Sequence, residues 1–291
     1  MKRLMICLML LWLLPAGARA DFEAKFLLPG QEEMITEDAY RSQDTAVELT
    51  RMRVNDSDVY IADIYLRSVE QLQRGFSGGA WAKSASYIST IAEENNAIIA
   101  ITGDSSQNFS AGWVVGNGTI YRSTPNRKRD LCIIRRSGEM LTLQAEEIDH
   151  EALAAASEDI WHTLLFGPVL LDAQGHALTD FSDSNVKYAN PRSVIGYYEP
   201  GHYCLVQVDG RGTRSALAES AAVNEGMTLE QLALLMESLG CKAAYNLDGG
   251  QSAAMWFCGE VISTPYGGGR GIGDVVMVTS GTSSLFSAIL D

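Results

Sequence analysis

Short apolar runs separated by turn residues dominate the chain from about position 46 onward. Runs rich in β-branched and aromatic residues predict strands, because such side chains pack well on a pleated surface. By contrast, residues 71–74 are too polar to predict a buried strand. The predicted strands are 59–66, 97–101, 131–134, 193–198, 203–208, 243–247, 253–257 and 274–278.

Helical periodicity is clearest over residues 229–239, where apolar side chains recur every three or four positions. Thr228 and Gln231 fit a capping box before this stripe, and Gly240 fits a helix end. Residues 84–94 and 147–162 also predict helices, the first with Ser84 as its N-cap. We therefore expect an α+β fold, a single domain with a mixed β-sheet core and flanking helices.

The first twenty residues have the pattern of a secretory signal peptide. Lys2 and Arg3 precede an apolar run over 4–14, and Ala18 and Ala20 fit a cleavage site. The run is shorter than the roughly 20 apolar residues that a membrane anchor needs. We expect a secreted, envelope or periplasmic protein, with a signal peptide at 1–20, a polar N-terminal segment at 21–45 and one domain at 46–291.

Composition narrows the classes of partner. The 291 residues are 46% hydrophobic and 20% charged, with a formal net charge of -14. This acidity argues against a nucleic-acid partner, which usually needs a basic patch, and against an anionic membrane surface. No apolar stretch after the predicted signal peptide is long enough to span a bilayer.

The cysteines and histidines show no metal-binding spacing, so the sequence identifies no metal ligand. Export permits disulfides, and buried free thiols are the alternative in a core of this size. The cysteines beyond the predicted signal peptide can pair in three ways, and they are Cys132, Cys204, Cys241 and Cys258.

Three apolar runs end at an aspartate next to glycine, at Asp104, Asp209 and Asp248. If these strands are parallel neighbours, their carboxyl ends meet at one edge. Arg192 and Arg211 would then join the carboxylates there. Such a set suits acid–base chemistry on a substrate with an anionic group, because arginine binds phosphate in a bidentate manner. The alternative is that each Asp-Gly pair only forms a turn.

Two further motifs are weaker. Residues 75–79 match a nucleophile elbow around Ser77, but no buried strand is predicted before them, so we do not expect a catalytic serine. The glycine-rich residues 267–273 match neither the dinucleotide-binding nor the P-loop pattern. They form either a mobile loop or a flap that places Arg270 over a site.

Several blocks resemble the phosphodiester glycosidase family, related to the catalytic domain of the lysosomal uncovering enzyme. The resemblance runs from about residue 47 to 278, with supporting blocks at 97–104, 166–168, 190–196 and 208–211. Its most specific blocks are GMTLEQLA at 226–233 and AYNLDGGQS at 244–252. It implies hydrolysis of a sugar-1-phosphodiester, such as an N-acetylglucosamine-1-phosphodiester, or of an exopolysaccharide or envelope glycan.

The resemblance also implies roles for individual residues. Asp248 would be the leading acid, base or nucleophile, with Asp209 or Asp104 as its partner. Arginines would hold the phosphate, and Asn246 and Ser252 would bind sugar hydroxyls. No cofactor is required, with Ca²⁺ or Mg²⁺ held by the aspartates as the alternative. The expected substrate-binding residues are Arg192, Arg211, Asn246, Gly249, Gly250, Ser252, Arg270 and Asp274.

The chain departs from the family pattern at several positions. Thr102, Ser105 and Ser106 stand where the pattern has an amide and aromatic residues, and Gln251 stands where it has glycine. Gly269 replaces the glutamate of a late Glu-Arg pair. These changes remove groups that would contact a sugar. The alternative function is therefore a non-catalytic glycan- or envelope-binding module that has lost activity.

Overall fold

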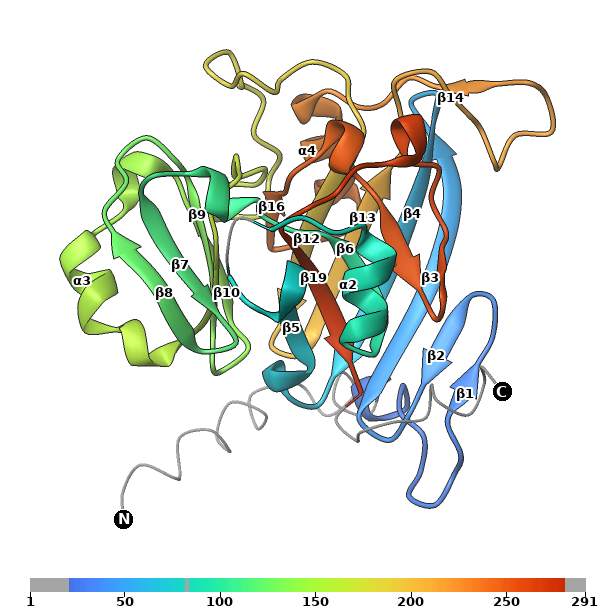
Figure 1. The fold of residues 1–291 in the computed structure, drawn as a ribbon, viewed down its shortest axis with the longest axis horizontal. Coiled ribbons are helices and arrows are strands. Elements are labelled where there is room, and N and C mark those ends of the chain that lie inside the picture. The colour runs from blue at the N-terminus through green and yellow to red at the C-terminus, as the bar shows by residue number, and fades with distance from the viewer. Residues whose placement is uncertain (1–20, 82–83, 281–291) are drawn as a thin grey trace.

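The computed structural model describes residues 21–81 and 84–280, so the predicted signal peptide lies outside the described residues. Strands dominate this part of the chain and form two large sheets and several small ones (Figure 1). The α-helices that border them are α2 (Ile88–Glu94), α3 (His150–Ala155) and α4 (Leu229–Ser238). No helix within the described ranges is both long enough and apolar enough to cross a membrane.

The larger sheet contains seven antiparallel strands. β13 and β16 both pair with β12, so they run in the same direction and their carboxyl ends lie at one edge. This arrangement places Asp209 and Asp248 at that edge. The spatial order is β1 (Met34–Ile35), β2 (Ala39–Arg41), β3 (Thr45–Val54), β4 (Ser57–Leu66), β13 (His202–Val208), β12 (Arg192–Glu199) and β16 (Ala243–Asn246).

The second sheet contains five antiparallel strands, and its central strand is buried at every position. Asp104 follows that central strand, so it comes from a different sheet than Asp209 and Asp248. The spatial order is β18 (Glu260–Val261), β17 (Met255–Phe257), β6 (Ala97–Thr102), β19 (Asp274–Thr279) and β5 (Leu72–Phe76).

Alternate side chains of β4 enter two different cores, as the pleat of a strand requires. Tyr60 and Ile64 join the apolar cluster that includes Ile99 of the five-stranded sheet. Val59 and Ile61 join the cluster that contains the buried face of α4. Helix α2 packs on the outer face of the five-stranded sheet. The main body therefore has four layers: α4, the seven-stranded sheet, the five-stranded sheet and α2.

A smaller group of strands lies beside these layers, together with α3 (Figure 1). Its own apolar cluster includes Trp113, Leu131 and Leu153. The group contains β7 (Gly112–Gly116), β8 (Thr119–Thr124), β9 (Leu131–Arg135), β10 (Met140–Leu143) and β11 (Ile160–Leu164). A short pair, β14 (Thr213–Arg214) and β15 (Val223–Asn224), lies elsewhere, next to β4.

The predicted combination of strands and helices is confirmed at this coarse level, with strands dominating. The predicted mixed sheet needs a correction, because the ladders between the named strands of the described residues are all antiparallel. Successive strands such as β3 and β4 are joined by tight turns, which favour antiparallel pairing. The single-domain organisation and its boundaries stay a prediction.

Helix α4 confirms the predicted capping box, since the Thr228 side chain accepts from the Gln231 N–H at 3.2 Å. Two other helices are shorter than predicted. Within 147–162 only α3 is α-helical, and β11 begins at Ile160 because its residues pair with β9. Helix α2 has Tyr87 as its N-cap. The predicted cap, Ser84, lies before the helix, and its hydroxyl donates to the Ser77 carbonyl at 2.7 Å.

Two segments for which no strand was predicted also form strands. Residues 72–74 enter β5 because the guanidinium of Arg74 is buried in contact with Asp274, which offsets the cost of burying its charge. The predicted polar segment at 21–45 contributes β1 and β2 to the edge of the seven-stranded sheet.

Candidate active site

The sharp turn after β16 is held by backbone contacts to both large sheets. The Asp248 N–H donates to the Gly103 carbonyl, which follows β6, at 3.0 Å. A Cβ on Gly249 would lie 2.6 Å from the Pro191 carbonyl oxygen, and Gly250 has a φ of +63°. Glycine is therefore required at both positions, first for close approach and then for a left-handed backbone.

The Asp248 carboxylate is the most accessible of the three candidate catalytic carboxylates, although its residue is only 6% exposed. Its Oδ2 accepts from Ser105 Oγ at 2.6 Å, and its Oδ1 accepts from the Gly249 N–H at 2.9 Å. Arg270 Nη2 lies 3.5 Å from Oδ2. These donors fix the orientation of the carboxylate.

The glycine-rich segment places Arg270 against this carboxylate. Arg270 Nε donates to Ser252 Oγ at 2.7 Å, while about half of its side chain stays exposed. Gln251 Nε2 donates to the Gly269 carbonyl at 3.3 Å, which ties the segment to the turn after β16. Ser252 therefore orients Arg270 in this structure.

Arg192 is buried at the start of β12, with its guanidinium in contact with backbone carbonyls. Nε donates to the Met227 carbonyl at 2.9 Å, and Nη2 donates to the carbonyls of Val186 (2.6 Å) and Tyr188 (2.5 Å). Burial and the nearby charge of Arg211 lower the pKa of Arg192 to about 10. The guanidinium remains protonated at neutral pH, in a region with excess positive charge.

Arg211 also lies against the turn after β16. Its Nε donates to Asn190 Oδ1 at 3.0 Å, and its guanidinium lies 5.4 Å from the centre of the Tyr266 ring. A Cβ on Gly250 would lie 2.8 Å from Arg211 Nη2, so the guanidinium touches the turn backbone. Within residues 21–81 and 84–280, neither Arg192 nor Arg211 forms an ion pair with a carboxylate.

Asp209 lies beneath the segment that leads to Tyr266. Its Oδ2 accepts from the Thr264 N–H at 2.8 Å, whereas its buried Oδ1 has no hydrogen-bond partner among the described residues. Burial raises the pKa of Asp209 to about 6, and the charge of Asp58 adds to the rise. An aspartate with this pKa can exchange a proton near neutral pH.

Asp104 and Asp274 lie in the interior, next to the guanidinium of Arg74. Arg74 Nη2 is 2.5 Å from Asp274 Oδ2 and 3.8 Å from Asp104 Oδ2. Asp104 Oδ1 accepts from the Leu165 N–H (2.5 Å) and the Phe166 N–H (2.6 Å). Burial raises the pKa of Asp104, and the neighbouring Asp274 adds to it, while Arg74 opposes the rise. This geometry suits positioning of the backbone better than contact with a substrate.

Asn246 joins the end of β16 to the neighbouring loop. Its Nδ2 donates to the Gly167 carbonyl at 2.7 Å, and its buried Oδ1 has no partner among the described residues. Apart from Asp209, which lies beneath the segment that leads to Tyr266, the predicted site residues form two groups. Asp248, Ser252, Arg270, Gly249, Gly250 and Arg211 meet at the turn, whereas Asp104, Asp274, Arg192 and Asn246 lie in its supporting structure.

The residues that depart from the family pattern take part in this support. Thr102 Oγ1 donates to the Ser252 carbonyl at 2.5 Å, and Ser106 Oγ accepts from Arg74 at 3.2 Å. Ser105, with a φ of +50°, makes the direct hydrogen bond to Asp248. From the sequence, Ser105 could be identified only as a departure from the family pattern. Arg74 could not be identified as a site residue, because the partners of Arg74, Asp104 and Asp274, are distant along the chain.

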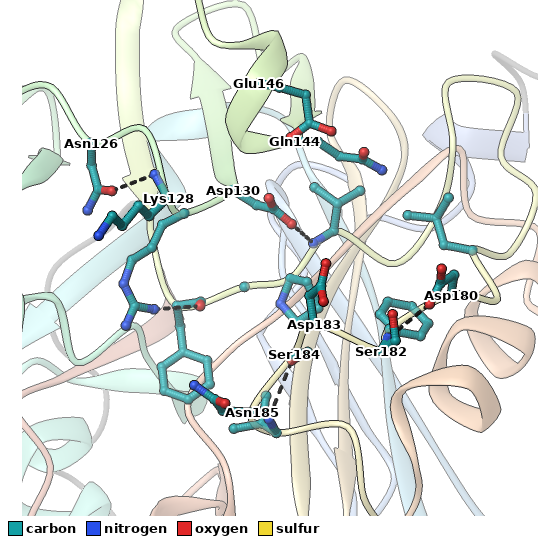
Figure 2. A pocket seen from close by; sticks show the side chains of 18 residues that line it. Asn126, Lys128, Asp130, Gln144, Glu146, Asp180, Ser182, Asp183, Ser184 and Asn185 are labelled. Atoms are coloured by element: carbon teal, nitrogen blue, oxygen red, sulfur yellow. Dashed lines mark hydrogen bonds between the residues drawn. The ribbon is translucent and has the colours of Figure 1, made fainter.

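A cavity of about 600 Å³ lies between loops of the small sheets and the segment before β12, and none of the predicted site residues is among those that line it (Figure 2). Asp130 braces its walls, since its carboxylate accepts from the N–H groups of Ala145 (3.1 Å) and Val169 (2.9 Å). Another wall includes Gly167, whose carbonyl accepts from Asn246. Polar side chains predominate around it, including Asn126, Lys128, Gln144, Glu146, Asp183 and Asn185.

A second cavity, of about 320 Å³, borders Arg270. Ser252 and Arg270 form part of its wall, while Ile88, Ala254 and Ile272 make another part apolar. The turn after β16 therefore borders the smaller, partly apolar cavity, whereas the hydrogen bond from Asn246 to the Gly167 carbonyl connects the end of β16 to a wall of the larger one.

Neither the Ser77 motif nor His162 has the surroundings of a catalytic group. Ser77 follows β5, but its Oγ contacts Ser86 Oγ at 2.8 Å, and no histidine in the described chain is bonded to it. His162 is buried, and burial lowers its pKa to about 3, so it is neutral. The part of the chain that the structure describes contains no cluster of three or more His, Cys, Asp or Glu side chains suited to a metal ion.

A sequence model of the family described as phosphodiester glycosidase matches residues 95–279. The SPbeta prophage-derived uncharacterized protein YomE of Bacillus subtilis (strain 168) is 27% identical over 182 residues, covering 60% of this chain and 26% of that protein. The chain thus spans about a quarter of the length of this curated relative.

Solved structures share the fold. The catalytic domain of zebrafish N-acetylglucosamine-1-phosphodiester alpha-N-acetylglucosaminidase, auto-inhibited by its pro-peptide, gives a TM-score of 0.62 at 17% identity, covering 81% of this chain and 83% of that one. A hypothetical protein from Synechocystis gives 0.60 at 13% identity, covering 86% and 64%. A Burkholderia pseudomallei protein, provisionally named an exported protein, gives 0.51 at 14% identity, covering 77% and 74%. With a family match over residues 95–279, the chain belongs to the phosphodiester glycosidase family.

Proposed function

We propose that this chain is an exported glycosidase that hydrolyses the bond between the anomeric carbon of a sugar and a phosphodiester oxygen. The observation that carries the proposal is the exposed guanidinium of Arg211, which touches the Asp248 turn without an acidic partner among the described residues. The nearby Arg192 adds a second positive charge, although its buried guanidinium is already bonded to backbone carbonyls. Arginine binds phosphate in a bidentate manner, so a phosphodiester suits this position, whereas a neutral glycan would leave the repulsion between the two arginines uncompensated.

The reaction adds water across the C1–O bond. Asp248 acts at C1 as nucleophile or as base for the attacking water, and the bonding electrons leave with the phosphate oxygen. Arginine contacts to the phosphate stabilise the charge that develops there, which reduces the need for a strong general acid. Arg270, which contacts Asp248 from the exposed side, helps to orient the carboxylate.

Asp209 is the proposed partner that exchanges a proton with the substrate or water. Its raised pKa and its unpaired Oδ1 support this role. Asp104 and Asp274 instead hold the backbone at residues 104–105 and 165–166. The smaller, partly apolar cavity, which Ser252 and Arg270 line, suits a substituent of the sugar.

Hydrolysis in ¹⁸O-labelled water tests the reaction class directly. The full chain is incubated with a panel of α-linked sugar-1-phosphodiesters that includes an N-acetylglucosamine-1-phosphodiester, and both products are analysed by mass spectrometry. Cleavage at C1–O places the label in the reducing sugar. A label in the phosphomonoester would instead show attack at phosphorus and overturn the proposal.

The second candidate function is a glycan- or envelope-binding module without activity. It is favoured by Thr102, Ser105, Ser106 and Gln251, which replace residues of the family pattern. This function predicts saturable binding of a polysaccharide or phosphodiester with no product.

A chelator added to the hydrolysis assay separates a metal-free reaction from one that uses Ca²⁺ or Mg²⁺.

A further inference from the structure

Two thiols meet in the core between the seven-stranded sheet and α4. Cys204 belongs to β13, and Cys241 follows α4 shortly before β16. Their Sγ atoms are 3.6 Å apart, and both residues are buried. Cys132 and Cys258 make no such contact with a second sulfur in the described residues. Of the three pairings that the sequence leaves open, the structure brings together only this pair.

Gly196 provides the space in which the two sulfurs meet. It is the register partner of Cys204 across the β12–β13 ladder. A Cβ at this position would lie 2.5 Å from Cys204 Sγ and 2.8 Å from Cys241 Sγ. Both sulfurs therefore lie over the bare Cα of Gly196. A side chain there would force them apart.

We propose that Cys204 and Cys241 are a redox site, oxidised to a disulfide when the chain folds in the presence of a small-molecule or protein disulfide. One thiolate attacks the oxidant disulfide and displaces one oxidant thiolate, and the second cysteine thiolate then attacks the mixed disulfide and displaces the other. The products are the Cys204–Cys241 bond and two reduced thiols of the oxidant, which take up the two protons that the cysteines lose. The sulfurs must approach by roughly 1.5 Å to reach bonding distance.

The location of this bond connects it to the candidate active site. Asp209 and Arg211 follow β13, and Asp248 follows β16, so the bond joins the two chain segments that carry these residues. The loop that the bond would close, from Cys204 to Cys241, also includes α4. Closing a loop of this length stabilises a fold mainly by restricting the unfolded chain. Because both sulfurs are buried, we expect oxidation during folding and slow reduction of the native protein.

Differential alkylation of the full chain tests the proposal. The chain is refolded in a mixture of oxidised and reduced glutathione, denatured and treated with iodoacetamide, and then reduced and treated with N-ethylmaleimide. We expect the second reagent on Cys204 and Cys241 and the first on Cys132 and Cys258, together with a linked peptide in a non-reduced digest. The first reagent on both Cys204 and Cys241 would overturn the proposal.

Variants provide a matched control. Reduction during unfolding should lower the Tm of the oxidised parent by roughly 5–10 °C. Cys132→Ala, which also removes a buried thiol, should keep this reductant-dependent shift. Cys241→Ala should lose it, and its Cys204 should take the first reagent. An equal shift in the Cys241→Ala variant would contradict the assignment of the bond.

Discussion

Three aspartates that look alike in sequence have different surroundings in the folded chain. Asp104 is fully enclosed and holds backbone N–H groups, and Asp209 keeps one unpaired oxygen in the interior. Asp248 reaches the surface between Ser105 and Arg270. Burial and partners, rather than the Asp-Gly motif itself, therefore separate the candidate catalytic carboxylate from its supports.

Arg211 gives a prediction at the residue scale, because its exposed position should allow substitution without unfolding the chain. Arg211→Ala removes a charge-assisted contact to the phosphate, so we expect kcat/KM to fall roughly 10- to 100-fold. Arg214→Ala is the matched control, since it removes an exposed arginine of the neighbouring strand β14. Equal kinetics in the two variants would remove Arg211 from the phosphate site.

Asp209 gives a pH-dependent prediction. Its pKa is about 6 in the folded chain, above the ordinary value of 3.8. Between these values the folded chain holds a proton that the unfolded chain has lost. The group therefore stabilises the fold at low pH, and this contribution is lost as pH rises through about 6.

Asp209→Asn removes this titration, so the variant should become more stable relative to the parent as pH rises from about 4 to 7. Urea unfolding at several pH values measures the difference in unfolding free energy. Asp56→Asn, at an exposed turn position, serves as the control. Parallel pH profiles of the parent and Asp209→Asn would contradict the raised pKa.

At the scale of elements, periodicity and capping residues predict local structure well. They do not predict a strand whose buried charge is paired with a residue distant in sequence. Helix α4 has the predicted capping box and apolar face, because both depend on residues within a few positions. β5 was missed because Arg74 is compatible with a buried strand only when Asp274 lies beside it. That pairing depends on the register with β19, which residues 71–76 alone do not encode.

The contribution of the α4 capping box to the stability of the fold can be tested. Thr228→Ala leaves the Gln231 N–H without its acceptor, so we expect the free energy of unfolding to fall by about 1 kcal/mol. Thr228→Ser retains the hydroxyl and should stay close to the parent. Urea denaturation of both variants measures the difference. Equal losses in the two would show that the methyl group, not the cap, matters.

At the scale of the whole molecule, the candidate site exists only where the two large sheets meet. β13 and β16 bring Asp209 and Asp248 to one edge, and the hydrogen bond from Asp248 N–H to the Gly103 carbonyl attaches the end of β6. The sequence could predict strands that end at aspartates. Through the family resemblance, it could also predict that these aspartates belong to the site. It could not predict that Asp104 would be enclosed, since that depends on the fit between sheets.

Export is a prediction for the whole chain, and it rests on the sequence of residues 1–20. Because the expected cleavage site follows Ala20, the mature protein should begin at Asp21. Expression of the full chain in a secreting bacterial host, followed by N-terminal sequencing of the exported protein, checks this. Retention in the cytoplasm with Met1 still present would contradict it.

The most direct test of the central claim compares turnover of sugar-1-phosphodiesters by the parent and by Asp248→Asn. The variant keeps the size of the side chain but removes its charge and basicity, so we expect the parent to release reducing sugar and the variant to lose at least about 100-fold in kcat. Circular dichroism and Tm should show that the variant folds. Undiminished turnover by a folded Asp248→Asn protein would contradict the assignment of Asp248 to the reaction.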